Sequence, residues 1–521
     1  MQTVYANVAA NGNQEHSARE HFERMTTFLG SGEAQALPHD QLEQWLTTEG
    51  RELQRRMLQE HLDLRAGSER TLVQVLGADA VEREETRPLS RALGSLFGSV
   101  MVWRLGYQAE GVACLCPLDA GLNLPPELYS YGVRRLVALH TARNSFDEVV
   151  EEIEAITGTA VHKRQVEELA RAAAQDFDAF YAQSNPDTQG VSRRAVLVLT
   201  ADGKGIAMRK EDLREATRRA AQSGSRKLQK RLTKGEKRNR KRMAEVAAVY
   251  LVEPYLRDAE DVLRELRPVH DVKTRRPRPT NKRVWASVVQ DAADVIDEAF
   301  QQAQRLDPTH ERRWVVVVDG NPDQIRAVRK IAARYRVKVT LILDVIHVIE
   351  YLWKAAYCFH PDASQEAEAW VTERLRALLT GHDSSQVAAG IRRSATRQCL
   401  SAAKREAADS CARYLINKRK LLGYADALRQ GFPIASGVIE GACRYLVKDR
   451  MDRTGACWSL DGAEAVLRLR ALRTNGDFDD YWRFHLTQEY NRNHRARYAE
   501  GKIPNPLATP SSAKPKLRRI K

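Results

Sequence analysis

The run Val196-Leu-Val-Leu-Thr-Ala-Asp202 decides the fold of this chain, because an uncharged and mostly apolar stretch ends in a single acidic residue. Such a stretch, without polar alternation, predicts a strand buried on both faces of a sheet. The pattern recurs in Trp314-Val-Val-Val-Val-Asp319 and in Val339-Thr-Leu-Ile-Leu-Asp344. Open α/β sheets bind ligands beyond the carboxyl ends of their strands, and carboxylates gathered there repel one another unless a cation joins them. The three runs therefore predict a metal site at one edge of a sheet.

Further elements are expected around these three strands. They are a short return strand at Gly205–Met208, a strand at Ala244–Val252, and helices over 281–305 and 325–335. If the first three strands are antiparallel and the last two run parallel beside the first, Asp202 and Asp319 become neighbours. Helical periodicity without a strand pattern then fills residues 345–432.

Phosphodiester cleavage by two hard cations about 3.5 to 4 Å apart requires carboxylate ligands. Asp202 and Asp319 each precede a glycine, which suits the close approach of a phosphate. We expect the third carboxylate on a helix at the sheet edge, and Glu440 at the start of such a helix fits this place. Each residue also has a structural alternative. The Asp residues are typical turn or helix-capping groups, and Glu440 is spaced to pair with Arg444 at i,i+4.

Several segments of the chain resemble one family of proteins. They are Thr200-Ala-Asp-Gly-Lys-Gly205, Val318-Asp-Gly320, Leu343-Asp-Val-Ile-His-Val348, Ser436-Gly-Val-Ile-Glu-Gly441 and Thr454-Gly-Ala-Cys-Trp-Ser459. In this order they look like the motifs of bacterial insertion-sequence transposases of the DDE type, most closely the Kra group, which is related to Mutator-like elements. The resemblance extends from about Leu93 to Arg497. It implies an α/β fold with a ribonuclease-H-like core, in which a mixed five-stranded sheet is followed by an all-helical insertion, and a mostly helical DNA-binding region before it.

The resemblance also implies roles for individual residues. Asp202, Asp319 and Glu440 are expected to be the catalytic residues and the ligands of two Mg²⁺ or Mn²⁺ ions. Asp344 and His347 match the Asp-x-x-His element that Mutator-like enzymes carry before the helical insertion. We expect this pair to support the site and not to bind metal directly. The support would be a mutual hydrogen bond that pins a strand to a helix, and direct metal binding by Asp344 is the alternative.

The composition indicates a polyanionic partner. Among 521 residues there are 83 Lys and Arg against 68 Asp and Glu, a formal charge of +15, which favours nucleic acid. The seven cysteines are scattered, which fits reduced thiols, and the spacing of Cys114-Leu-Cys116 is too tight for a zinc pair. Neither a signal peptide nor a membrane span is recognisable. We therefore expect a cytoplasmic, nucleoid-associated protein.

Basic residues cluster in several places that we expect to contact DNA. Between residues 226 and 242 they are dense and lack aromatic neighbours, which predicts contacts to the DNA backbone and not to bases; a solvated charge run is the alternative. In the cluster after Glu440, Trp458 is expected either to stack on an unpaired end base or to lie in the core. The expected DNA-binding residues are Lys163, Arg164, Lys204, Arg226, Lys227, Lys230, Arg231, Lys237, Arg238, Arg240, Lys241, Arg242, Arg444, Lys448, Arg450, Arg453 and Trp458.

A helix pair within residues 145–181 has the proportions of a helix-turn-helix. Lys163 and Arg164 lie at the start of its second helix, where residues that read base edges are found; a plain helical hairpin is the alternative. The expected segments of the whole chain are an N-terminal helical module (1–92), a small β element with the helix-turn-helix-like region (93–190), a core (191–344) with a basic insertion (211–243), a helical insertion (345–432), the C-terminal part of the core (433–490) and a basic flexible tail (491–521).

Together these features predict a transposase that cleaves DNA at the terminal inverted repeats of its own element and joins the ends to target DNA. Both steps are in-line attacks at phosphorus and need no covalent enzyme intermediate. Bringing two ends together implies a homodimer or a larger assembly on double-stranded DNA. The alternatives are a catalytically silent DNA-binding protein that keeps the fold, and a ribonuclease-H-like nuclease that cleaves without joining.

Overall fold

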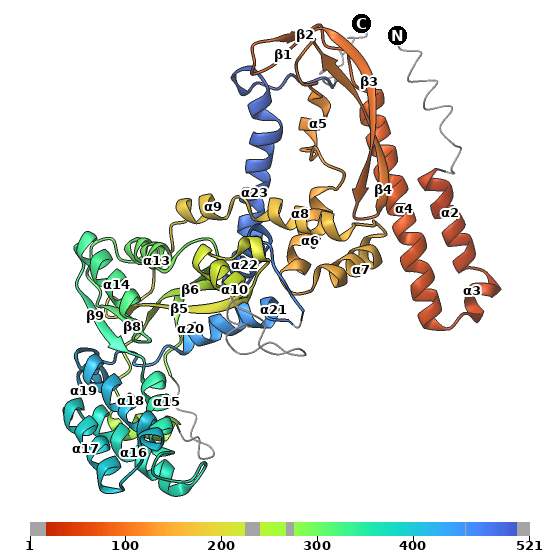
Figure 1. Cartoon of the computed structure of the whole chain (residues 1–521). Coiled ribbons are helices and arrows are strands. Elements are labelled where there is room, and N and C mark those ends of the chain that lie inside the picture. Colours follow the sequence, from red (N-terminus) through yellow and green to blue (C-terminus); the bar gives the residue numbers. More distant parts are fainter. Residues whose placement is uncertain (1–16, 224–239, 267–275, 454, 508–521) are drawn as a thin grey trace, which may run out of the picture. The chain divides into compact units, whose positions relative to one another are not determined.

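The chain forms two compact units in the computed structural model, which describes residues 17–223, 240–266, 276–453 and 455–507. The first unit is Met1–Phe180 together with Phe478–Lys521, and the second unit is Tyr181–Asp477. The elements of both are labelled in Figure 1. The expected end of the core at residue 490 is displaced to 477, because helix α23 (Phe478–Asn493) packs within the first unit.

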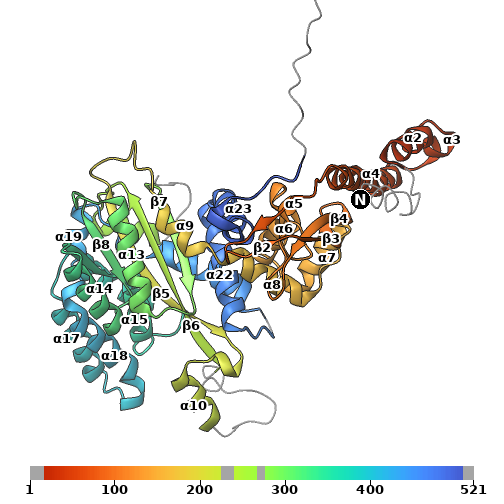
Figure 2. The same cartoon turned by 90° about the horizontal axis from the view of Figure 1, so that it is seen from above.

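The second unit is built on a mixed five-stranded sheet, as the sequence predicts. Its strands are β5 (Val196–Ala207), β6 (Lys241–Val252), β7 (Thr280–Ser287), β8 (Trp314–Val318) and β9 (Val339–Leu343). They lie in the order β7-β6-β5-β8-β9. Strands β5, β6 and β7 form an antiparallel meander (Figure 2), and β8 runs parallel to both β5 and β9. The expected direction of the last two strands beside the first is confirmed.

The expected return strand at Gly205–Met208 is wrong, because β5 continues without a turn to Ala207. Strand β6 pairs with β5 over this whole length, from Val196 opposite Val252 to Ala207 opposite Lys241. The two strands therefore form one long, continuous antiparallel ladder, and the glycines after Asp202 lie inside it.

The helix expected from Asn281 is also wrong at its beginning, where the chain forms strand β7. Trp285 and Ala286 of β7 are buried and pair with β6, so tertiary pairing decides the conformation of this stretch. The helix that follows, α13 (Ala292–Leu306), begins only after Asp291, whose side chain accepts hydrogen bonds from two backbone N–H groups of the first turn.

Helices cover this sheet on both faces. Strand β8 is buried at every residue, which requires a helical layer on each side of it. Helix α13 packs on β5 and β6, and α14 (Pro322–Arg334) packs on α13. Helix α22 (Leu460–Asn475) packs on β7.

Residues 345–432 are helical between strand β9 and the helix that carries Glu440. The α-helices of this insertion are α15 (Val345–Ala356), α16 (Gln365–Leu379), α17 (Ser384–Arg397), α18 (Ala402–Lys418) and α19 (Tyr424–Arg429). Helix α12 (Ala259–Leu266), from between β6 and β7, packs on α16. After the insertion the chain forms α20 (Gly437–Ala442), a π-helical segment η3 (Cys443–Lys448) and α21 (Asp449–Met451).

The first unit begins with helices and then forms a β-hairpin. The helices are α2 (Ala18–Leu29), α3 (Gly32–Ala36) and α4 (His39–Gly67). The hairpin strands are β3 (Glu85–Ser95) and β4 (Gly98–Gln108), so the β element starts before the expected residue 93. Leu62 of α4 is buried against Leu93 and Val100 of the hairpin, which is why the helical module and the β element form one core.

A second core of this unit contains three further helices. They are α6 (Tyr131–Thr141), α7 (Phe146–Thr157) and α8 (Lys163–Ala174). Their buried residues include Val133, Ile153 and Val166, one from each helix. The turn between α7 and α8 starts at Gly158, which has a φ of 68° and ends α7 in the left-handed conformation.

The expected flexible tail from residue 491 is ordered over most of its described part. Tyr498 is buried with Leu105 and Tyr107, and Leu507 makes an isolated β-bridge with Glu69. Residues 508–521 lie outside the described part of the chain. No helix of the described residues has both the length and the apolar composition of a membrane span.

Candidate active site

Asp202 lies within β5, and Asp319 directly follows the last residue of the neighbouring parallel strand β8. Thr200 of β5 pairs with Val317 of β8, and each Asp follows two residues later. Because side chains alternate along a strand with a period of two, both Asp residues continue the face that this pair begins. Backbone N–H groups fix one oxygen of each: Gly203 donates to Asp202 Oδ1 and Asn321 to Asp319 Oδ1, both at 2.7 Å.

Helix α20 brings Glu440 to the same edge. The helix packs on β5 and β6, and Cys443, about one turn after Glu440, donates a hydrogen bond from Sγ to Asp202 Oδ2 at 3.3 Å. Partial burial raises the pKa of Glu440, and the negative charges of Asp344 and Asp202 raise it further, while His347 opposes them. Glu440 therefore lies within electrostatic reach of the first Asp, and its side chain is exposed.

Asp344 is buried completely and serves as a clasp between two segments. Its Oδ1 accepts from the backbone N–H of Ile346 at 2.9 Å, which caps α15. Its Oδ2 accepts from both the backbone N–H, at 3.2 Å, and the hydroxyl of Ser436. Among the described residues, Asp344 is hydrogen-bonded across the fold to Ser436 and not to His347. The expected Asp–His hydrogen bond is therefore absent within the described residues. Asp344 thus ties the end of β9 to the residue from which α20 starts.

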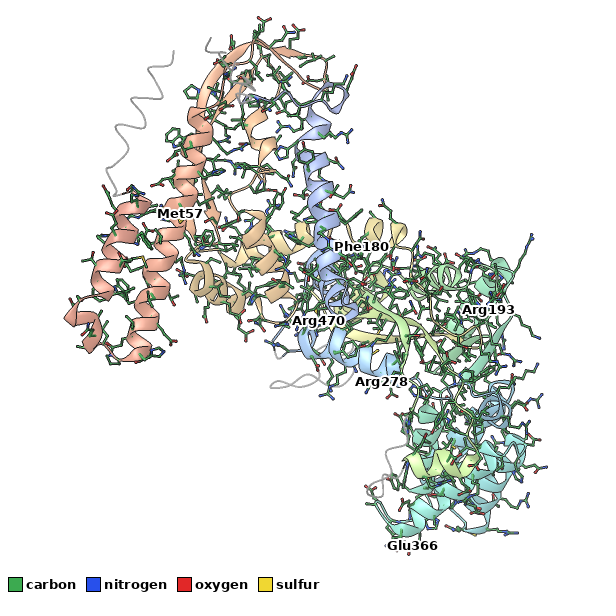
Figure 3. The ribbon with its side chains drawn as sticks, turned by 180° about the vertical axis from the view of Figure 1, so that it is seen from behind. Met57, Phe180, Arg193, Arg278, Glu366 and Arg470 are labelled. Atoms are coloured by element: carbon green, nitrogen blue, oxygen red, sulfur yellow. The ribbon has the colours of Figure 1, made fainter. Side chains whose placement is uncertain are left out.

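The π-helical segment η3 after Glu440 is held by an arginine from α22. A π-helical turn shifts the backbone hydrogen bonds and leaves carbonyl groups without their regular helical partners. Arg470, labelled in Figure 3, donates to the carbonyl of Leu446 at 2.8 Å and to that of Tyr445. Burial lowers the pKa of Arg470 to about 10, so it remains a cation at neutral pH. The sequence offered no signal for this segment.

A fourth carboxylate, Glu245 of β6, was missed by the sequence analysis. Glu245 pairs with Gly203 across the β5–β6 ladder, and a Cβ atom at Gly203 would stand 3.4 Å from Glu245 Oε2. Burial raises the pKa of Glu245; Arg214 opposes this shift, and the charges of Asp202 and Asp319 add to it. In the sequence, Glu245 could have been noticed because it is the acidic residue within the otherwise apolar run of β6 from residue 243 to residue 252.

The oxygen ligands at this edge suit a hard cation such as Mg²⁺. No described residue donates a hydrogen bond to Glu440 or to Asp319 Oδ2, so these oxygens are available to a ligand. The carboxylates do not, however, form a compact ligand set. Within the described residues, one group of three potential metal ligands has all its ligand atoms within 4.8 Å of one another. It consists of Asp176, His485 and Glu489, which belong to the first unit.

The buried Asp176–His485–Glu489 group could hold a metal ion by its distances alone. Its oxygens already have partners: His485 Nδ1 lies 2.7 Å from Asp176 Oδ2, and Arg492 pairs with Asp176 at 2.6 Å and also with Glu489. Arg134 pairs with Glu489 as well, at 3.4 Å. A metal would have to displace these guanidinium groups, so we interpret the group as an ion-pair network that fastens α23 within the first unit.

The basic insertion is described only in part. Arg226, Lys227, Lys230, Arg231, Lys237 and Arg238 lie outside the described residues. Arg240 is exposed and Lys204 is half-buried on β5, whereas Lys241 pairs with Asp452 at 3.1 Å. Arg242 donates to the carbonyls of Val288 and Asp212 at 2.6 and 3.1 Å, so this side chain braces the second unit internally. Arg242 is nevertheless half-buried and not enclosed, so its expected DNA contact stays a prediction.

The residues expected to bind DNA after Glu440 divide into exposed and buried ones. Arg444, Lys448 and Arg453 are exposed. Trp458 is 6% exposed and Arg450 is 3% exposed, with the guanidinium 4.7 Å from the centre of the indole ring. Trp458 also donates from Nε1 to the carbonyl of Met451 at 3.1 Å. The expected stacking of Trp458 and the DNA contact of Arg450 are corrected, because both side chains are enclosed in the core.

Lys163 and Arg164 are exposed at the start of α8, as expected for the second helix of a helix-turn-helix. Lys163 pairs with Asp147 at 2.7 Å and Arg164 with Glu168 at 3.0 Å. Exposed ion pairs of this kind contribute at most about 1 kcal/mol, so they would not prevent contacts with phosphates or bases.

Comparisons with known proteins give no relatives. No model of a protein family matches the chain, and no curated protein matches it.

Proposed function

We propose that this chain is a DDE transposase with a ribonuclease-H-like core, in which Asp202, Asp319 and Glu440 are the catalytic carboxylates. The observation that carries the proposal is the register of β5 and β8, which aligns the first two residues, together with α20, which brings the third within electrostatic reach of Asp202. These features support a site in which three residues far apart in the sequence would act together at the edge where α/β sheets bind ligands.

The site would hold Mg²⁺ or Mn²⁺ between the two strand ends and Glu440. Two bound ions supply a nucleophilic oxygen and stabilise the leaving oxygen, first for water and then for a 3′-hydroxyl group. Glu440 must move towards the Asp residues to complete such a set, and its exposed side chain leaves room for this motion. The Asp344–Ser436 clasp limits how far α20 can move.

The basic surfaces would hold the double-stranded DNA of the element ends and of the target. Arg444, Lys448 and Arg453 lie on the segments that follow Glu440, and α8 presents Lys163 and Arg164 in the first unit. Synapsis of two ends would require a dimer or a larger assembly. Binding through phosphates should weaken steeply with salt concentration.

The test is a cleavage and joining assay on DNA that carries the sequences flanking the gene. With Mg²⁺ or Mn²⁺, the protein should nick the ends and join them to target DNA, and Asp319→Asn should abolish both products. Asp323→Asn is the matched control, because Asp323 lies on α14 after the same strand and pairs with Arg326 in solvent. Cleavage without joining would favour the nuclease, and binding without metal-dependent cleavage would favour the silent DNA-binding protein.

A further inference from the structure

Helix α18 of the helical insertion packs directly on the loop of the second catalytic Asp. The hydroxyl of Tyr414 donates to the backbone carbonyl of Asp319 at 3.0 Å. Gly320, the next residue, has a φ of 95°, and a Cβ atom there would stand 3.1 Å from the Tyr414 hydroxyl and 3.4 Å from Cε of Lys418. Glycine is therefore required at position 320 both for its backbone conformation and for the approach of α18.

An aromatic stack fixes this part of α18. The rings of Tyr414 and Tyr351 lie 4.0 Å apart and within 13° of parallel, and Tyr351 belongs to α15, the helix that starts at Asp344. Lys354 lies over the Tyr351 ring at 5.3 Å. Both helices of the stack thus begin or end beside a carboxylate of the site, and the stack sets their spacing.

Lys418, one turn after Tyr414, is a half-exposed cation beside Asp319 and Gly320. Among the residues that the structure describes, no carboxylate lies within ion-pair distance of its ammonium group. Arg413, Arg419 and Lys420 are exposed at the same end of α18 and also make no ion pair within the described ranges. Arg405, nearer the start of the helix, differs because it pairs with Asp409 at 2.9 Å.

Cations at the end of a helix also interact favourably with its carbonyl groups. That effect explains a basic residue at this position, but it does not explain why Lys418 packs against the glycine that follows a catalytic Asp. A phosphate held between the strand ends would lie close to this ammonium group, and a lysine binds phosphate as a point charge from several directions.

We propose that Lys418 binds a backbone phosphate of the DNA strand at the catalytic edge, and that Arg413, Arg419 and Lys420 continue this contact along the end of α18. The helical insertion would then form one wall of the DNA-binding site, with Tyr414 as the residue that positions this wall against Asp319. This inference depends on the proposed function, because the ligand is the DNA strand on which the carboxylates act.

The test measures binding of an end-containing duplex in Ca²⁺, a condition chosen to retain the complex without cleavage. Lys418→Met should lower the slope of log Kd against log salt concentration by about 0.9, the value for one phosphate contact. Lys418→Arg should keep the wild-type slope. Arg405→Met removes a basic residue from the same helix and should leave the slope unchanged.

Cleavage in Mg²⁺ separates this inference from the proposed function. If wild-type protein cleaves and Lys418→Met keeps the wild-type slope, KM and kcat, the phosphate contact is refuted while the transposase proposal stands. If wild-type protein does not cleave, the proposed function itself fails. Tyr414→Phe should lower kcat more than it raises Kd for DNA, since it removes the hydrogen bond to the carbonyl of Asp319 and retains the aromatic ring. If instead Tyr414→Phe loses activity only as far as its melting temperature falls, and Lys418→Met changes neither binding nor cleavage, α18 has a purely structural role.

Discussion

Glu440 lies near three other carboxylates, those of Asp344, Glu350 and Asp202, and this position makes its negative charge unfavourable for the folded state. Its pKa is raised by partial burial and by Asp344, so the folded protein holds a proton on Glu440 more strongly than the unfolded chain does. Stability linked to this group is therefore present at low pH and is lost as the pH rises through the folded-state pKa. A divalent cation at the site would offset the repulsion.

We predict that Glu440→Gln raises the melting temperature at pH 7.5 in the presence of EDTA, because the repulsive charge is removed. Under the proposed function, the same variant should lose strand cleavage by about 100-fold or more, since the proposed metal ligand would contribute several kcal/mol of transition-state stabilisation. Calorimetry at pH 7.5 and at pH 4 checks the stability effect, which should shrink at the lower pH where the wild-type carboxyl is protonated. A variant less stable than the wild type at pH 7.5 would contradict this interpretation.

Glu69 gives a second prediction at the scale of single residues, in the first unit. Burial raises the pKa of Glu69 to about 7, although its Oε2 accepts from the backbone N–H of Leu105 at 2.8 Å. Because the folded pKa is raised, stability falls as the pH increases from about 4.5 to above 7.

Glu69→Gln should therefore flatten the dependence of stability on pH between 5 and 8. Urea denaturation of the first unit, followed by the fluorescence of its tryptophans at several pH values, measures the change. Glu84→Gln is the control, because Glu84 is exposed and should leave the pH dependence intact. An unchanged profile for Glu69→Gln would show that another group titrates.

At the scale of elements, the hydrogen bonds between Asp344 and Ser436, the clasp described above, fix the start of α20 relative to the sheet. The hydroxyl of Ser436 donates to Asp344 and does not cap α20, so the helix start is fixed by β9 and not by local capping. Hydrogen bonds to charged groups contribute about 1.5 to 3 kcal/mol, and this one is buried.

We predict that Ser436→Ala costs about 2 kcal/mol of unfolding free energy and lowers kcat more than it raises KM, because Glu440 loses its fixed starting point. Denaturation curves and steady-state kinetics check the two parts. Ser401→Ala is the matched control: Ser401 is exposed at the start of α18 and makes no side-chain capping bond. A loss of stability without a change in kcat would separate the clasp from catalysis.

The elements that the sequence predicted well are those with a strong local signal. Uncharged β8 and β9 were located to within a residue. Strand β8 is buried at every residue and shows no polar alternation, whereas β9 lies at the sheet edge with Thr340 exposed and was located by its uncharged run alone. The start of the helix at 281 was predicted wrongly because the polar residues of β7 fit several conformations, and pairing with β6 decides among them. The end of β5 was predicted wrongly for the same reason: its glycines fit a turn as well as a strand, and pairing with β6 keeps the chain extended.

At the scale of the whole molecule, α23 belongs to the first unit although it follows the second unit in sequence. The hydroxyl of Tyr481 donates to the carbonyl of Ala173 at 2.6 Å, and Glu489 pairs with Arg134 in the interior. Removal of one partner from a buried ion pair leaves the other charge uncompensated and typically costs about 3 to 5 kcal/mol.

A chain that ends at Asp477 should therefore keep the second unit folded and destabilise the first. Hydrogen exchange followed by mass spectrometry should show protection of β5 and β8 as in the full chain, and faster exchange over α6 and α8. A chain that ends at Leu507 is the control and should exchange like the full protein. Equal protection of α6 with and without α23 would contradict the division into these two units.

The sequence by itself determined the buried strands, the acidic residues at their ends and the helical character of residues 345–432, because these follow from local periodicity and from the position of each residue in its own element. Only the tertiary structure decided which residues surround those carboxylates. Glu245 of β6, Ser436 before α20, and Tyr414 and Lys418 of α18 reach the site through strand register and helix packing. The enclosure of Trp458 is of the same kind, since burial depends on contacts with distant segments that no local pattern records.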